Sequence, residues 1–189
     1  STEILAARAL AGNIEDICTV VIFAISGTTA IIVGREIGAG RGKESVYQVG
    51  AVMDTLALAA GGIIGLLLAA AAWWVLPWAV YPRFLLSDTA SQTATMMLTF
   101  TGVFLALRAF NSNNTVGVLR GGGDVRAAMR IDTLPLWCVA LPLTVLFGLV
   151  LKWGIFWVYV GITMEQVTKF GAGVRRFRSR VWINDITRA

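Results

Sequence analysis

The sequence predicts an all-α fold, a polytopic membrane helix bundle of about five transmembrane helices. Of the 189 residues, 57% are hydrophobic and 14% are charged, and the mean hydropathy is +0.73, whereas a soluble domain carries about 25% charged residues. A soluble core cannot bury this much apolar surface. The apolar runs also lack the alternating pattern of a transmembrane β-barrel strand. We therefore expect an integral membrane protein.

Five segments are long and apolar enough to cross a bilayer, which takes about 20 residues. They lie at about 4–34, 46–76, 92–117, 127–150 and 153–174. The third segment is the least apolar, because its last third is polar. The short connections leave no room for a soluble domain, so 1–189 is expected to form one transmembrane domain.

The positions of lysine and arginine predict the orientation. These residues concentrate in 35–43, 120–130 and 175–188, whereas the alternate connections carry Arg83 and Lys152. Because cytoplasmic loops carry the excess of positive charge, the basic segments and the C-terminus are predicted to be cytoplasmic. The N-terminus then begins outside, so we expect at least one further helix upstream.

Polar residues within the apolar segments are the candidate ion- and substrate-binding residues, because charged groups at membrane depth are costly and face a cavity or a partner. With a rise of about 1.5 Å per residue, they lie roughly 5–15 Å from the cytoplasmic ends of four different segments. These residues are Asp54, Arg108, Asn111, Asn114, Asp132 and Glu165. Their similar depth predicts one shared polar layer.

The chemistry of this layer favours a positively charged ligand. One of its three carboxylates can pair with Arg108, which leaves the others without a counter-charge. Burial without a counter-charge favours the protonated form of a carboxylic acid, and carboxylate and amide oxygens, including those of Asn111 and Asn114, could instead hold Na+. The alternative is that the acids only link helices by hydrogen bonds or reach the membrane interface.

Two further acids, Glu15 and Asp16, lie near the outer end of the first segment. They are candidates for an acidic outer vestibule that attracts cations. The alternative is an ordinary hydrated helix end.

The residue content argues against an enzyme. The chain has no histidine, which is the commonest metal ligand and general base. The stretch GVLRGGGD lacks the Lys-Ser pair of a phosphate-binding loop. We expect no metal, no cofactor beyond a coupling ion, and no nucleic-acid partner, because a basic tail beside a membrane favours topology and contact with anionic lipids.

Two polar turns carry a family resemblance. VGREIGAGRGKE at 33–44 resembles the VGxxxGAG turn of the multidrug and toxic compound extrusion (MATE) family. FNSNNTVGVLRGGGDVRAAM at 110–129 is similar to the GVLRGGGDT turn of clostridial and related bacterial members. The segment ID…LPLW…LPL, Glu165, Lys169 and the tail RFRSRVWINDIT are also similar, so the resemblance covers nearly the whole chain.

The resemblance implies the C-terminal lobe of a two-lobed, twelve-helix antiporter, with the present segments as helices eight to twelve and the N-terminal lobe absent. It implies a multi-pass protein of the bacterial inner membrane that exports small organic, often cationic compounds or drugs, driven by H+ or Na+ entry. The lipid bilayer, the organic substrate and the missing lobe are the implied partners. An essential aspartate of some sodium-coupled members falls at Ala109, so that ligand is absent. The alternatives are a lipid-linked precursor flippase of the same superfamily and a non-transporting membrane subunit.

Overall fold

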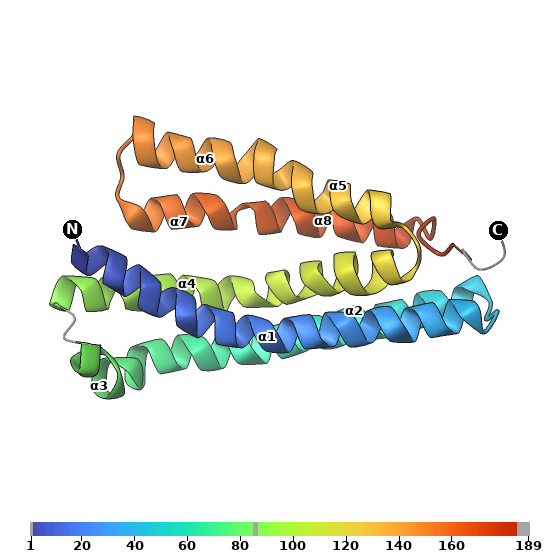
Figure 1. Ribbon diagram of the computed structural model, residues 1–189, viewed down its shortest axis with the longest axis horizontal. Coiled ribbons are helices and arrows are strands. Elements are labelled where there is room, and N and C mark those ends of the chain that lie inside the picture. The colour runs from blue at the N-terminus through green and yellow to red at the C-terminus, as the bar shows by residue number, and fades with distance from the viewer. Residues whose placement is uncertain (1, 85–86, 185–189) are drawn as a thin grey trace.

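The structure is a computed structural model that describes residues 2–84 and 87–184 (Figure 1). All regular elements in these two ranges are helices, which confirms the predicted fold class. The elements are α1 (Thr2–Gly38), α2 (Lys43–Trp74), α3 (Leu76–Ala79), a 3-10 turn (Tyr81–Phe84), α4 (Asp88–Ser112), a π segment (Asn113–Leu119), α5 (Val125–Pro135), a π segment (Leu136–Ala140), α6 (Leu141–Val145), a π segment (Leu146–Val150), α7 (Ile155–Thr163) and α8 (Glu165–Arg178).

Four stretches in the described residues are long and apolar enough to cross a membrane. They are Arg8–Gly38, Lys43–Trp74, Asp88–Leu119 and Val125–Val150. The fifth expected segment, 153–174, forms α7 and α8, which are separated at Met164 and are each shorter than a full span. The helices extend a few residues beyond most of the expected ranges.

Glycine and proline explain the local shape of the helices. Gly40 (φ 70°) and Gly123 (φ 87°) turn the chain between α1 and α2 and before α5, in a backbone region that favours glycine. Pro135 ends α5, and the π segment Leu136–Ala140 follows it. Because proline lacks an N–H, it interrupts the regular hydrogen-bond ladder of the helix.

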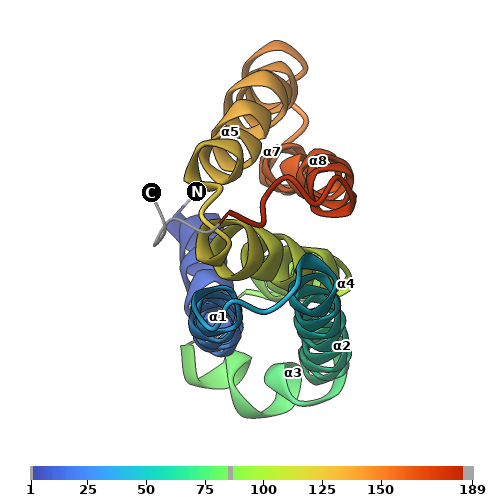
Figure 2. The same ribbon diagram turned by 90° about the vertical axis from the view of Figure 1, so that its right-hand side faces the viewer.

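The bundle has two parts that meet at α4. α1, α2 and α4 lie side by side along the length of the molecule, and α7–α8 packs against α4 (Figure 1). The end-on view places α4 between the α1–α2 pair and the α7–α8 rod (Figure 2). α4 therefore contributes side chains to the interior of both parts.

One end of the bundle, called here the arginine-rich end, carries the α1–α2 turn, the start of α5 and the end of α8. After α8 the chain folds back there, and Trp182 is fully buried and donates its indole N–H to the Phe177 carbonyl at 2.9 Å. At the opposite end, Trp73, Trp74 and Trp78 are exposed. Tryptophans at that level are typical of a membrane interface.

Candidate ion- and substrate-binding site

The crossing of α2 and α4 brings the polar half of α4 against α2. Gly61, Gly65 and Gly102 lie at this crossing, and a Cβ atom on Gly61 would lie 2.5 Å from the Cβ of Ala109. Small residues of this kind let membrane helices approach closely. Ala109 is 1% exposed and occupies that contact, so a carboxylate side chain would have no space at this position.

Asp54 on α2 is the most deeply buried acid described, with 3% of its surface exposed. Its Oδ1 accepts a hydrogen bond from Nδ2 of Asn113 at 2.8 Å, and its Oδ2 accepts one from Nδ2 of Asn114 at 2.7 Å. Two amides from the π segment that continues α4 therefore hold one carboxylate from α2. Asp54 and Asn114 were both predicted from the sequence as candidates, and the structure brings them into contact.

A hydroxyl from α1 completes this network. Thr29 donates to the Oδ1 of Asn113 at 2.7 Å, and the hydroxyls of Ser26 and Ser112 lie 3.1 Å apart. The network, defined as Thr29, Asn113, Asp54 and Asn114, thus joins three helices. We call it the Asp54 network.

Asn113 was not among the residues predicted from the sequence, which were chosen by their depth along each helix. In an α-helix, neighbouring residues point about 100° apart, so Asn113 and Asn114 are not expected to reach the same carboxylate. Both asparagines lie at the start of the π segment Asn113–Leu119, where the regular geometry is interrupted. π segments occur frequently at functional sites, and the run NSNN was the available signal.

No cationic side chain in the described residues forms an ion pair with Asp54. Of the other described acids, Asp16 and Asp88 also lack ion pairs, but both are exposed. Glu15, Glu165 and Asp124 are substantially buried, and each has a basic partner. An ionised carboxylate without a cation is costly in a low-dielectric interior, so the Asp54 network is suited to take up a proton or a small cation.

Free acceptor capacity lies next to Asp54. The Oδ1 of Asn114 is buried and has no hydrogen-bond donor in the structure. A Cβ atom on Gly173 of α8 would lie 2.9 Å from that oxygen, so the glycine allows α8 to approach it. A cavity of about 240 Å³ lies beside Asp54, with Tyr47, Phe177 and Arg178 among its lining residues. This cavity extends from Asp54 toward the arginine-rich end.

A second polar site lies between α1, α4 and α7. Glu15 accepts hydrogen bonds from Arg108 and from the hydroxyl of Tyr159, the latter at 3.1 Å. Arg8 lies 3.9 Å from the same carboxylate and over the ring of Tyr159. The Tyr159 hydroxyl also contacts that of Thr101. We call these residues the Glu15 network.

The prediction that Arg108 pairs with Asp54, Asp132 or Glu165 is therefore wrong, since its partner is Glu15. The sequence placed these groups by depth along each helix, which does not fix the direction in which a side chain points. Glu15 faces the interior of the bundle, whereas Asp16 is exposed. The two neighbouring acids thus do not form one patch.

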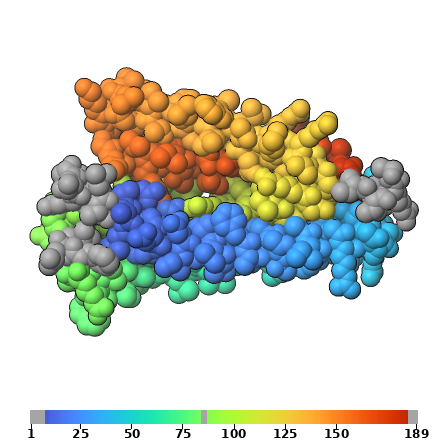
Figure 3. Space-filling model, viewed as in Figure 1, coloured from blue at the N-terminus to red at the C-terminus, as the bar shows by residue number. Residues whose placement is uncertain are grey.

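A cavity of about 250 Å³ adjoins the Glu15 network, and its lining includes Arg8, Arg108, Glu165 and Gln166. Figure 3 shows a hollow on the face between α1 and α7–α8, with α4 at its base. Glu165 pairs with Lys169 at 2.9 Å, and its other oxygen, Oε2, is buried and has no donor among the described residues. Glu165 is thus one of the acids that line this cavity.

The remaining predicted residues have separate partners. Nδ2 of Asn111 donates to the backbone and side-chain oxygens of Gln166 at 2.8 and 2.9 Å. Asp132 pairs with Arg120 at 2.9 Å, and both are partly exposed. Asp54, Asp132 and Glu165 therefore share no partner, and the single carboxylate cluster expected from their depth is not formed. Their predicted roles as ligands remain predictions.

Long apolar helices around buried polar networks define a polytopic membrane protein, and the sequence comparisons identify its class as a membrane transporter. A sequence profile of the MatE family matches residues 1–146. The chain belongs to the MatE family, which confirms the resemblance noted from its turns.

The chain is also similar to the "Uncharacterized transporter YisQ" of Bacillus subtilis (strain 168). The two are 29% identical over 165 residues, which are 85% of this chain and 34% of that protein. The chain thus spans about a third of the length of this curated relative. No solved structure gave a significant match.

Proposed function

We propose that the whole protein is a cation-coupled antiporter that exports small organic, often cationic compounds, and that Asp54 binds the coupling ion, H+ or Na+. The observation that carries the proposal is the burial of Asp54 between two amides with no cationic partner in the described residues. Membership in the MatE family and the transporter relative support it.

Proton binding and sodium binding would act on the Asp54 network in different ways. A proton on Asp54 turns one carboxylate oxygen into a donor, which conflicts with the amide N–H group that now donates to it. Sodium requires oxygens, so it favours rotation of Asn113 or Asn114 to present an amide oxygen. Either change alters the contact between α2 and α4. Alternating access in secondary transporters arises from movements of one group of helices relative to another.

The cavity beside the Glu15 network is the proposed contact region for the organic substrate. Its volume of about 250 Å³ is below the 300–1,000 Å³ typical of a ligand pocket. We therefore propose that residues outside this chain, corresponding to the N-terminal lobe, complete the pocket. We also propose that the protein lies in a bacterial inner membrane with the arginine-rich end in the cytoplasm.

Ion-coupled efflux from cells that carry the full-length gene tests the proposal. Asp54→Asn is expected to abolish ion-driven efflux of an organic cation such as ethidium, because the amide cannot bind a proton or supply a charge to sodium. Asp88→Asn is the matched control, since Asp88 is exposed and forms no ion pair with any residue that the structure describes. Unchanged coupling in Asp54→Asn would contradict the assignment of Asp54.

A further inference from the structure

A large groove at the arginine-rich end is not used by the proposed transport sites. It lies between α5 and α8 and has a volume of about 790 Å³. Small residues, Ala127 on α5 and Gly171 and Ala172 on α8, line the groove and leave space between the two helices. The groove is lined entirely by residues of this helix pair and the adjoining residues Asp124 and Ser179.

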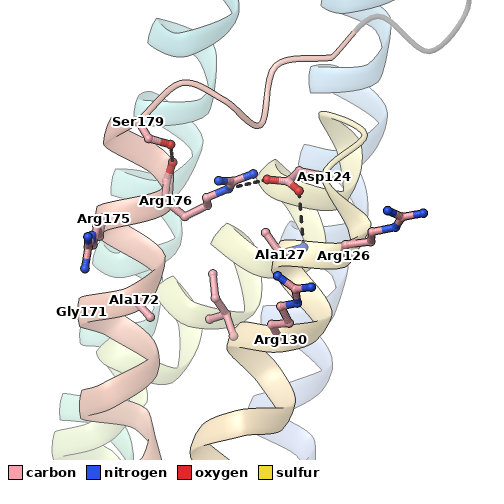
Figure 4. A pocket seen from close by; sticks show the side chains of 10 residues that line it. Asp124, Arg126, Ala127, Arg130, Gly171, Ala172, Arg175, Arg176 and Ser179 are labelled. Carbon is pink, nitrogen blue, oxygen red and sulfur yellow. Dashed lines mark hydrogen bonds and ion pairs between the residues drawn. The ribbon is translucent and has the colours of Figure 1, made fainter. Parts of the chain in front are cut away.

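Arginines dominate the polar lining of the groove. Arg176 pairs with Asp124 at 2.6 Å, and Asp124 also caps the start of α5 through the Ala127 N–H. Figure 4 shows this pair across the upper part of the groove, with Arg130 below it and Arg126 at one side. Arg175 lies on the opposite side, on α8 (Figure 4).

Three of these arginines have no acidic partner within the described residues. Arg126, Arg130 and Arg175 are exposed and form no ion pair within the described residues. Asp124 is the single acid among the lining residues and is already paired with Arg176. The groove therefore carries a strong positive charge that an anion can balance.

The surface next to the groove becomes apolar toward the middle of the bundle. Leu134 on α5 lies about one turn beyond Arg130, Val167 on α8 lies about one turn before Gly171, and both are exposed. Further along the same two helical rods is a second furrow of about 440 Å³, lined by Trp137, Leu141 and other largely apolar residues. At about 1.5 Å per residue, Trp137 lies about 10 Å along the helix from Arg130.

We propose that this groove binds the phosphate of an anionic membrane lipid, with an acyl chain along the apolar surface beyond it. Arginine forms paired hydrogen bonds with phosphate oxygens, and basic pockets between transmembrane helices bind anionic headgroups. Orientation of the protein in the membrane requires only positive charge at this end. Arg35, Lys43 and Arg178 supply such charge outside the groove.

Lipid binding to the purified full-length protein, measured by native mass spectrometry, tests the proposal. Phosphatidylglycerol is expected to bind more tightly than phosphatidylcholine. The variant Arg126→Gln/Arg130→Gln/Arg175→Gln is expected to bind phosphatidylglycerol at least about tenfold more weakly, since each arginine contributes about fivefold near an anionic headgroup.

The control variant Arg35→Gln/Lys43→Gln/Arg178→Gln removes the same charge from exposed positions outside the groove. It is expected to retain most of the affinity. Equal losses in the two variants would show diffuse attraction and overturn the groove as the site. Inorganic phosphate that binds alone at low millimolar concentration and displaces the lipid would overturn the assignment to a lipid.

A second variant tests the shape of the groove without changing its charge. Ala172→Leu adds bulk to the lining and keeps every arginine, and it is expected to weaken phosphatidylglycerol binding while the melting temperature stays the same. Undiminished binding in Ala172→Leu would place the lipid elsewhere and overturn the proposal. Size-exclusion profiles of all variants are compared with that of the wild type to check that each variant remains folded.

Discussion

Asp54 and Glu15 are both acids within the bundle, but different groups balance their charges. Glu15 is surrounded by Arg108, Arg8 and the Tyr159 hydroxyl. Asp54 has only the amides of Asn113 and Asn114. Both carboxylates connect helices, yet only the Glu15 carboxylate has cationic partners within the described residues.

This difference predicts a structural role for Glu15 and an ion-binding role for Asp54. A carboxylate held by arginines has little reason to take up a proton or a metal cation, because the ion would compete with the existing positive charge. A carboxylate held by neutral amides has its negative charge balanced when it binds either a proton or a metal cation. The Glu15 network is therefore expected to stabilise the bundle, and the Asp54 network to respond to ions.

The largest effect that this comparison predicts is the effect of an Asp54 substitution on transport. Asp54→Asn is expected to remove ion coupling but to leave the protein folded, because it removes a costly buried charge and because rotation of the Asn114 amide would let its unpartnered oxygen accept from the new N–H group. Two measurements test this expectation: efflux from cells that carry the full-length gene, and thermal unfolding of the purified full-length protein. A variant that loses both stability and transport would assign Asp54 a structural role instead.

Glu15→Gln is expected to show the opposite pattern, a loss of stability. Breaking a buried ion pair costs about 3–5 kcal/mol, and the 35% exposure of the Arg108 side chain reduces our expectation to about 2 kcal/mol. Denaturant unfolding measures the change. Glu36→Gln is the control, since the Arg41 side chain in its ion pair is 62% exposed and the pair is expected to contribute less than about 1 kcal/mol.

A comparable effect is expected at the helix crossing that positions Asp54. Gly65→Ala places a methyl group against the backbone carbonyl of Gly102, and such overpacking costs about 1–3 kcal/mol. Gly62→Ala is the matched control, because the nearest atom to its Cβ, in Ala106, is 3.9 Å away. Equal melting temperatures for the two variants would contradict the close crossing of α2 and α4.

The smallest expected effect is at Asp132. Its pair with Arg120 is partly exposed, and surface ion pairs contribute about 0–1 kcal/mol. Asp132→Asn is expected to change the free energy of unfolding by less than about 1 kcal/mol and to leave ion coupling intact. A coupling defect as large as that of Asp54→Asn would restore Asp132 as a ligand.

Hydropathy was sufficient to predict four long helices, because membrane-spanning segments must be long and apolar, but it did not predict the break between α7 and α8 at Met164. It also indicated Asp54 and Asn114, since polar groups in such segments are costly. It could not pair them, because direction around a helix depends on packing and on the π segment at Asn113–Leu119. The Glu15–Arg108 pair was missed for the same reason, as its partners are 93 residues apart in the chain.

The most direct test of the central claim counts ions released when substrate binds. The purified full-length protein is titrated with an organic cation such as tetraphenylphosphonium, and released H+ and Na+ are measured in the wild type and in Asp54→Asn. Release of one of these ions by the wild type and none by Asp54→Asn is the expected result. Equal release by the two proteins would show that the coupling ion binds elsewhere.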